Sequence, residues 1–108
     1  MSLSTHVLNA TTGSPAVGLG VRVETQHGDR WHAGPEHRTD HDGRISALES
    51  PGTGVHRIHF DTGAYFAAEG IETFYPEVAI TFVVNDAQGH YHVPLLLSPF
   101  AFSTYRGS

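Results

Sequence analysis

The residues of this chain that could carry out acid–base chemistry are mainly histidines. The sequence contains nine of them in 108 residues, and the imidazole group has an unperturbed pKa of about 6.5, close to neutrality. His90 and His92 are separated by one residue in a strand-like stretch, so both side chains are expected on one face of a sheet. Tyr91 and Val93 would then point to the opposite face, toward the core. The pattern therefore predicts an outward-facing pair of histidines.

These histidines allow three interpretations. The pair could be exposed and without a role, because polar residues alternate with apolar ones in any half-buried strand. With His6, which also alternates with apolar residues in an N-terminal strand, His90 and His92 could hold zinc, a metal that binds imidazole nitrogens. Neutral imidazoles could instead act as general bases. The pattern alone leaves the three open.

Arg44 and the C-terminal tetrapeptide could contribute to a binding site. Arg44 follows an Asp-Gly turn, where it could be a solvated turn residue. Its planar guanidinium would also suit a planar substrate with carbonyl oxygens, or an oxyanion forming on one. The chain stops on Tyr105-Arg106-Gly107-Ser108, just beyond two strand-like runs. Since chain ends usually fray, an arginine and a terminal serine in this place indicate an end that is held and used.

Other kinds of chemistry lack their usual motifs. There is no Gly-x-Ser-x-Gly elbow, which disfavours a hydrolase with a serine nucleophile, and no glycine-rich phosphate loop. The absence of cysteine excludes disulfides, thiolate metal sites and thiol catalysis. Asp40 and Asp42 lie in a Thr-Asp-His-Asp-Gly stretch and are better explained as turn formers than as a metal loop.

Composition limits the partners and the location. The formal charge is −5, with six arginines and no lysine, so neither nucleic acid nor an anionic membrane surface is an expected partner. The first residues lack the basic start and apolar run of a signal peptide. No segment approaches the roughly 20 apolar residues that span a bilayer. We therefore expect a cytoplasmic protein.

The length and the low charge indicate one domain that assembles with copies of itself. A chain of 108 residues is expected to form a single domain, residues 1–108. Charged residues make up 16% of the sequence, below the usual figure of about 25%. This favours a surface that is partly buried in an oligomer.

Alternation of apolar and polar residues predicts an all-β fold. Several short strands separated by frequent turn signals are typical of a two-sheet β-sandwich. The predicted strands begin near Leu3 and cover Val17–Val23, Trp31–Arg38 with a break at Gly34-Pro35, Val55–Phe60, Val78–Val84 and His90–Leu97.

Three details of this prediction are specific enough to be checked. Val78–Val84 is apolar and rich in β-branched residues, as expected for a central strand, and Asn85–Gly89 is expected to be a hairpin loop. Pro94 requires a bulge or an edge position in the strand that contains it. A short helix is expected over Thr62–Glu69, with Asp61 or Thr62 as its N-cap and Gly70 at its C-terminal end.

Motifs spread over nearly the whole chain, in order, resemble those of the transthyretin-like family and, within it, the 5-hydroxyisourate hydrolases. They are His6-Val7-Leu8-Asn9 with Gly13-Ser14-Pro15-Ala16, Asp42-Gly43-Arg44, Phe74-Tyr75-Pro76-Glu77-Val78, Tyr91 to Pro99, and Phe102 to Ser108. The hormone-carrying transthyretins lack both the Tyr-Arg-Gly-Ser tail and the histidines of the hydrolase site. This chain has both, so the resemblance favours the enzyme over a carrier of small aromatic ligands, which is the alternative.

The resemblance implies a β-sandwich of about eight strands with one short helix. Four subunits, a dimer of dimers, would surround a central channel, and the active sites would lie where the dimers meet. The implied reaction hydrolyses 5-hydroxyisourate to 2-oxo-4-hydroxy-4-carboxy-5-ureidoimidazoline in urate degradation.

The resemblance also implies roles for individual residues. The catalytic group would be His6, Arg44, His92 and Ser108. Substrate would be bound by Arg44, His90 and the tail residues Tyr105, Arg106, Gly107 and Ser108. In this scheme His92 and His6 deprotonate a water molecule, and Arg44 stabilises the oxyanion. No metal or cofactor is required, although zinc could bind incidentally at His6, His90 and His92.

Overall fold

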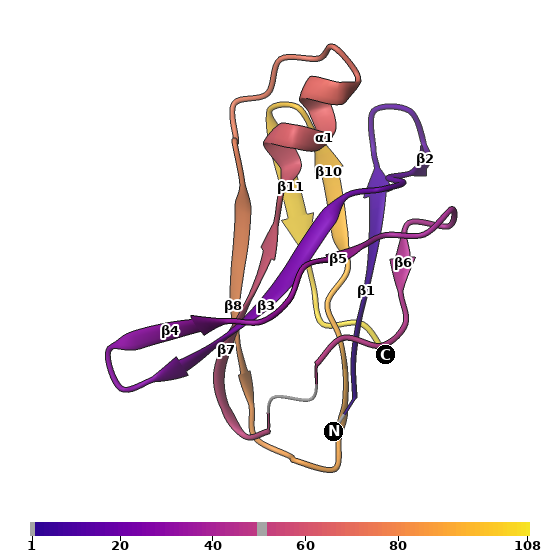
Figure 1. Cartoon of the computed structure of the whole chain (residues 1–108). Coiled ribbons are helices and arrows are strands. Elements are labelled where there is room, and N and C mark those ends of the chain that lie inside the picture. The colour runs from indigo at the N-terminus through magenta and orange to yellow at the C-terminus, as the bar shows by residue number, and fades with distance from the viewer. Residues whose placement is uncertain (1, 50–51) are drawn as a thin grey trace.

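The chain folds into a β-sandwich with one short helix (Figure 1). The computed structural model describes residues 2–49 and 52–108. Within these residues, the first sheet contains β1 (Ser2–Asn9), β2 (Ser14–Pro15), β6 (Arg44–Ile45), β9 (His90–His92), β10 (Leu95–Ser98) and β11 (Ala101–Thr104). The second contains β3 (Gly20–His27), β4 (Arg30–Ala33), β5 (His37–Arg38), β7 (Gly54–Phe60) and β8 (Val78–Val84). The predicted two-sheet sandwich is confirmed.

The described strands outnumber the eight that were expected. Three of them, β2, β5 and β6, are only two residues long, too short for an alternating pattern to reveal. Pro94 also divides the expected strand His90–Leu97 into β9 and β10.

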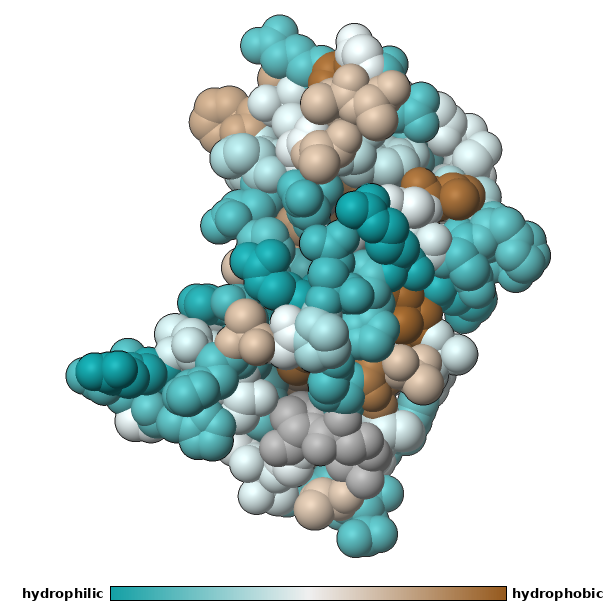
Figure 2. Space-filling view, in the orientation of Figure 1, coloured by the Kyte–Doolittle hydropathy of each residue, from teal (hydrophilic) through white to brown (hydrophobic). Residues whose placement is uncertain are grey.

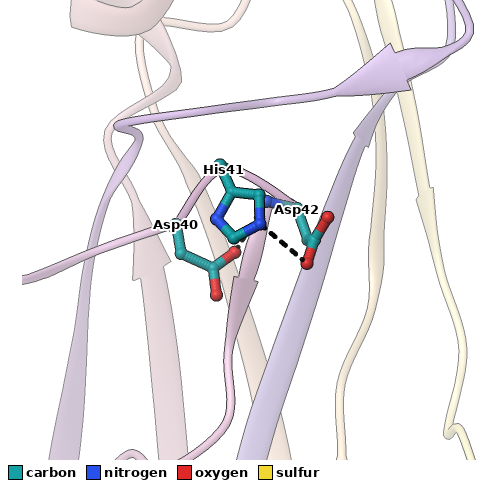
Figure 3. Close-up of side chains that lie close together, drawn as sticks. All are labelled: Asp40, His41 and Asp42. Atoms are coloured by element: carbon teal, nitrogen blue, oxygen red, sulfur yellow. Dashed lines mark hydrogen bonds and ion pairs between the residues drawn. The ribbon is translucent and has the colours of Figure 1, made fainter.

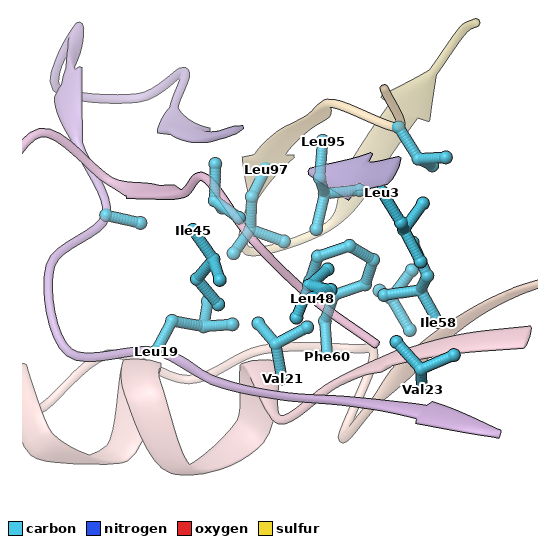
Figure 4. Packing of buried hydrophobic residues seen from close by; sticks show 14 of the residues in the cluster. Leu3, Leu19, Val21, Val23, Ile45, Leu48, Ile58, Phe60, Leu95 and Leu97 are labelled. Atoms are coloured by element: carbon cyan, nitrogen blue, oxygen red, sulfur yellow. The ribbon is translucent and has the colours of Figure 1, made fainter. Parts of the chain in front are cut away.

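The core lies between the two sheets (Figure 4). Leu3 of β1 and Leu97 of β10 face Ile58 and Phe60 of β7, and all four side chains are fully buried. Val17 was expected to continue this alternation, but it is 53% exposed because β3 begins only at Gly20. Figure 2 shows that the face seen in this orientation is mainly hydrophilic, with small separate hydrophobic areas.

Pro94 interrupts a strand without shifting its register. Both β9 and β10 run parallel to β1, with Ser4 opposite His92 and Val7 opposite Leu95, which is the same offset on either side of the proline. The Val93 carbonyl accepts a hydrogen bond of 2.6 Å from the Thr5 hydroxyl. The break therefore leaves the residues on both sides in phase, and the histidines of β9 share a face with the outward residues of β1.

Two sequence predictions about the second sheet are wrong. Val78–Val84 forms β8, but β8 ends the order β4-β3-β7-β8 and so is an edge strand. The strand is apolar because one of its faces is buried, although only one of its two edges pairs with a neighbouring strand in the described part of the chain. Val83 on the other face is 60% exposed. Asn85–Gly89 is not a hairpin loop, because it leads from β8 to β9 in the other sheet. The Tyr91 hydroxyl holds this crossing by accepting from the backbone N–H groups of Asn85 and Asp86.

Helix α1 (Thr62–Ala68) forms where it was predicted. The Asp61 carboxylate accepts a hydrogen bond from the Ala64 N–H, and Phe66 is buried against the core. Gly70 follows with φ of +69°, the conformation that ends many helices. Within the described residues, no helix is long and apolar enough to cross a membrane.

Candidate active site

Three strands of the first sheet carry the predicted catalytic side chains. β1 lies between β9 and β6, with Ser4 opposite His92 in one pairing and His6 opposite Arg44 in the other. His90 is exposed and His92 half-buried, whereas Tyr91 between them is buried. The predicted outward orientation of the two histidines is confirmed. Because residues 88 positions apart pair in this way, the N-terminal strand and the C-terminal part of the chain form one surface.

A tight turn that contains Asp40, His41 and Asp42 (Figure 3) leads into Arg44. One carboxylate oxygen of Asp40 accepts hydrogen bonds from the backbone N–H of Asp42 at 2.8 Å and of Arg44 at 2.9 Å. The bond from Arg44 is the largest cause that lowers the pKa of Asp40 below its ordinary value. Gly43 has φ of +74°, and a Cβ there would collide with the Val7 carbonyl. Asp40 therefore acts as a turn former, as predicted, and the Asp-Gly-Arg sequence places Arg44 beside β1.

The C-terminal tail is held against β9 at two points. The Gly107 N–H donates a hydrogen bond of 2.8 Å to the carbonyl of His92. A Cβ on Gly107 would collide with Cδ2 of the His92 ring, so only glycine fits there. The guanidinium of Arg106 lies 4.5 Å from the ring centroid of Tyr91, a cation–π contact. These contacts leave Ser108 as the one tail residue beyond the attachment.

The surface is hollowed where these elements meet. We call this hollow, which measures about 320 Å³, the histidine pocket. Its lining consists of Ser4, Thr5, Arg44, Ile45, Ser46, His90, His92 and Ser108. The pocket thus combines two imidazoles, a guanidinium, hydroxyl groups and the C-terminal residue.

The structure does not bring all the predicted site residues into this pocket. Arg44, His90, His92 and Ser108 line it, but His6 and Tyr105 line a neighbouring hollow of about 220 Å³ together with Leu8, Pro94, Leu95 and Leu96. Arg106 lines a third, mainly apolar hollow of about 240 Å³ on the Tyr91 side of β9. Within one chain, the contact of Arg106 with Tyr91 attaches the tail and directs the guanidinium away from the histidine pocket.

His92 is the histidine of the pocket whose basicity is clearly altered. Its partial burial is the main cause that lowers its pKa below the ordinary value of 6.5, and the nearby charges of Arg44, His90 and His6 lower it further. A hydrogen bond with the Ser4 backbone acts in the opposite direction. The net effect lowers the pKa of His92 and so favours the neutral imidazole, which is the form that can accept a proton.

We expect the His92 ring to titrate below pH 6.5 in the folded protein. The titration can be measured from the pH dependence of the NMR signals of the ring. These signals are assigned through their loss in a His92 variant. Because the charge of His90 contributes to the shift, His90→Gln should move the midpoint of His92 upward. A His92 midpoint at or above 6.5 in the native protein would contradict this description of the pocket.

Sequence reasoning missed the hydroxyl groups that contact the two histidines. The Ser4 hydroxyl lies 2.8 Å from Nδ1 of His92, and the Ser2 hydroxyl forms the same contact with Nδ1 of His90. The sequence did contain a sign of them, because Ser2 and Ser4 alternate along β1 with the same period of two residues as His6 and so lie on the same outward face. The pairing of β1 with β9 is a long-range contact that the sequence alone does not reveal.

The three histidines do not form a ready zinc site. Among residues 2–49 and 52–108, the group whose possible ligand atoms all lie within 4.8 Å of one another is Asp40, His41 and Asp42. All three of these residues are exposed, and Asp40 is already engaged in the turn. Incidental zinc binding at His6, His90 and His92 would require side-chain movement or groups from another chain.

Comparison with known proteins agrees with this fold. The sequence model of the HIUase/Transthyretin family matches residues 3–107. The chain is 43% identical over 109 residues to the 5-hydroxyisourate hydrolase of Salmonella dublin, an alignment that covers 98% of this chain and 80% of that one.

Two solved structures are similar over nearly the whole chain. The 5-hydroxyisourate hydrolase of Klebsiella pneumoniae superposes with a TM-score of 0.88 and 35% identity, over 100% of both chains. Sea bream transthyretin in complex with thyroxine gives a TM-score of 0.89 and 31% identity, over 99% of this chain and 95% of that one. The fold is thus shared by an enzyme and by a protein that binds a small aromatic molecule, so the side chains of the site must distinguish the two functions.

Proposed function

The chain belongs to the HIUase/Transthyretin family, and from this membership and the histidine pocket we propose that it hydrolyses 5-hydroxyisourate in urate degradation. The substrate is a bicyclic ring system with several carbonyl groups. Hydrolysis opens its six-membered ring at the N1–C6 amide bond. The product is 2-oxo-4-hydroxy-4-carboxy-5-ureidoimidazoline.

The observation that carries this proposal is the content of the histidine pocket. One hollow contains a proton acceptor, His92, whose pKa is held below its ordinary value, and a guanidinium, Arg44. Amide hydrolysis needs a base for the attacking water and a donor for the negative charge that forms on the carbonyl oxygen. The pocket supplies both.

The proposed reaction proceeds in two steps. A water molecule attacks C6 while the His92 imidazole takes one of its protons, and a tetrahedral oxyanion forms. The C6–N1 bond then breaks, N1 receives the proton from the His92 imidazolium, and the former carbonyl carbon becomes a carboxylic acid, which releases its proton to the solvent and becomes a carboxylate. Arg44 holds the substrate and stabilises the oxyanion. His6 and His90 assist in binding and orienting the water and the substrate.

The tail completes the site in this proposal. Ser108 lines the pocket, and it would orient the substrate or the imidazolium. Gly107 places Ser108 there through its hydrogen bond with the His92 backbone. Tyr105 would close the rim of the site from the neighbouring hollow.

We expect Gly107→Ala to lower kcat about tenfold or more. The added methyl group would collide with the His92 ring, so the tail would be displaced and Ser108 would leave the pocket. Misplacement of a group by about 1 Å can cost as much as 10²-fold in rate. The rate of hydroxyisourate decay measures the effect.

Gly20→Ala is the matched control for the Gly107 variant. The nearest atom to its added Cβ is the end of the flexible Glu36 side chain, which can move. Its activity should stay close to that of the native protein. Native kcat in Gly107→Ala would show that the fixed tail is not needed.

A direct assay tests the function itself. Hydroxyisourate is generated from urate and urate oxidase, and its ultraviolet decay is followed with and without metal-free protein. Faster decay in the presence of the metal-free protein supports a hydrolase that needs no metal. Activity that is lost on chelation and restored by zinc would disprove the metal-free mechanism. Decay at the spontaneous rate, from folded protein, would reject the hydrolase.

The second candidate is a carrier of small aromatic ligands. Its support is the similarity to transthyretin in complex with thyroxine. A carrier site needs an apolar lining. Two imidazoles and a guanidinium, such as those of the histidine pocket, are not needed for it. If the assay shows no hydrolysis, binding of aromatic ligands measured by calorimetry would favour the carrier.

We also propose that the active form is a homotetramer, a dimer of dimers around a central channel. Among the described strands, β8 and β11 end their sheets, and an uncovered edge strand can pair with another chain. Exposed apolar side chains lie nearby, including Phe74 at 71%, Phe100 at 64% and Val83 at 60%. Apolar groups exposed together often mark an interface. Light scattering should give four times the chain mass, and a monomer would contradict the proposal.

A further inference from the structure

The ring of His92 is fixed by the residue that faces it across β1 and β9. Ser4 and His92 are direct register partners. The Ser4 hydroxyl lies 2.8 Å from Nδ1, and Ser4 is itself buried. On the other side of the ring, Cδ2 lies against Gly107, at the point where the tail is bonded to the His92 backbone. The imidazole is thus enclosed between β1 and the tail.

We propose that Ser4 is a positioning residue that holds the proton of His92 on Nδ1 and thereby leaves Nε2 free as the proton-accepting atom. The inference rests on the proposed hydrolase function and deepens it. It assigns the base to one nitrogen of one histidine, which the sequence could not do because several histidines lie near the site.

The positions of the two ring nitrogens favour this tautomer. Nδ1 lies 2.8 Å from the hydroxyl of the buried Ser4, so a water molecule in the pocket can reach only Nε2. A base that acts through Nε2 must carry its proton on Nδ1. The Ser4 hydroxyl oxygen can accept from the same N–H and keep its own proton for a group in the pocket. A neutral imidazole has one proton, so a proton on Nδ1 leaves the lone pair on Nε2.

The geometry of the ring directs this lone pair away from the sheet. Nδ1 faces Ser4 and Cδ2 faces Gly107, so Nε2 lies on the outer edge of the imidazole. Within residues 2–49 and 52–108, no protein group forms a hydrogen bond with Nε2. His92 lines the histidine pocket together with Arg44, so a water molecule there could give its proton to Nε2 while the guanidinium binds the carbonyl oxygen.

Ser2 and His90 provide a natural comparison within the same strands. They are also register partners and form the same hydroxyl–Nδ1 contact. Both residues are exposed, however, and neither the tail nor another strand encloses the His90 ring in the described structure. Ser2 does not line the histidine pocket, so its contact should not affect the chemical step, whereas the Ser4 contact should control that step.

The experiment compares Ser4→Ala, Ser4→Thr and Ser2→Ala in two measurements. The first is kcat and KM for hydroxyisourate hydrolysis. Ser4→Ala should lower kcat about tenfold, the effect of one lost neutral hydrogen bond on a rate, with KM within about twofold. Ser4→Thr keeps the hydroxyl and should restore kcat. Ser2→Ala should leave kcat within about twofold, and any loss should be in KM.

The second measurement is nitrogen NMR of the His92 ring, which reports the protonated nitrogen without any substrate. Nδ1 should carry the proton in the native protein and in Ser4→Thr, and protonated Nε2 should increase in Ser4→Ala. A proton on Nε2 in the native protein would overturn the inference, whatever the activity. So would native kcat in Ser4→Ala, or an equal loss of kcat in Ser2→Ala.

The two measurements separate this inference from the proposed function. If the native protein does not hydrolyse hydroxyisourate, the proposed function fails. A Ser4-dependent proton on Nδ1 would in that case still support the positioning of the ring. If hydrolysis is normal but the tautomer does not depend on Ser4, the function stands and the role of Ser4 is rejected.

Discussion

Replacing His92 with asparagine is expected to lower kcat for hydroxyisourate about 10²- to 10⁴-fold, the usual contribution of a general base. Asparagine has no group that accepts and returns a proton near neutral pH. Its amide nitrogen can still donate a hydrogen bond to Ser4 from about the position of Nδ1, so the pairing of β1 with β9 should survive. The thermal midpoint and the oligomeric state should therefore stay close to the native values.

His27→Asn is the matched control for this loss. His27 is exposed at the end of β3, in the other sheet, and its ring contacts only the neighbouring ring of His32 among aromatic groups of the described residues. The same exchange there should leave kcat unchanged. Full activity in His92→Asn would refute its role as the base, and loss of the tetramer in that variant would point to a structural role instead.

The fold was predictable because its signals are local. Alternation in β1 and β7 marks which side chains face the core, and Leu3, Val7, Ile58 and Phe60 are fully buried as that pattern requires. Helix α1 has its cap residue and its terminal glycine in sequence order. The orientation of His90 and His92 follows from the same period of two residues. None of these inferences needs to know which strands pair.

The errors arose where pairing decides the outcome. β8 is apolar like a central strand, but it has a neighbour on only one side in the described structure. The segment Asn85–Gly89 has the residues of a hairpin turn, and the same residues suit a loop that crosses between sheets. Tyr91 supports the crossing, because its hydroxyl accepts hydrogen bonds from the loop and Tyr91 itself belongs to the other sheet. Such a long-range contact leaves no periodic signal.

The site was predictable by residue type but not by arrangement. The motif Tyr105-Arg106-Gly107-Ser108 is one unit in the sequence, yet in the structure its members face three different hollows. Arg106 contacts Tyr91, Gly107 contacts His92, and only Ser108 lines the histidine pocket. The sequence of the short tail does not show which hollow each side chain faces. The hydrogen bond between Gly107 and His92 sets the direction in which each side chain points.

Replacing Arg44 with glutamine should lower kcat about 10²- to 10³-fold, the range seen when one donor to an oxyanion is removed. The turn should remain intact, because Asp40 binds the backbone N–H of Arg44 and not its side chain. Arg44→Lys should recover only part of the rate, since an ammonium group keeps the charge but lacks the planar pair of donors. Arg30→Gln, an exposed change on β4 in the other sheet, is the matched control.

The same variant has a second consequence that does not depend on catalysis. The charge of Arg44 is among the causes that lower the pKa of His92, so Arg44→Gln should move the NMR titration midpoint of His92 upward, and Arg44→Lys should move it less. A loss of rate without this shift would mean that Arg44 acts on the substrate alone. Native kcat in Arg44→Gln would remove the oxyanion donor from the mechanism. Loss of rate together with the shift would show that one guanidinium serves both purposes, because it stabilises the charge formed on the substrate and keeps the neighbouring imidazole neutral.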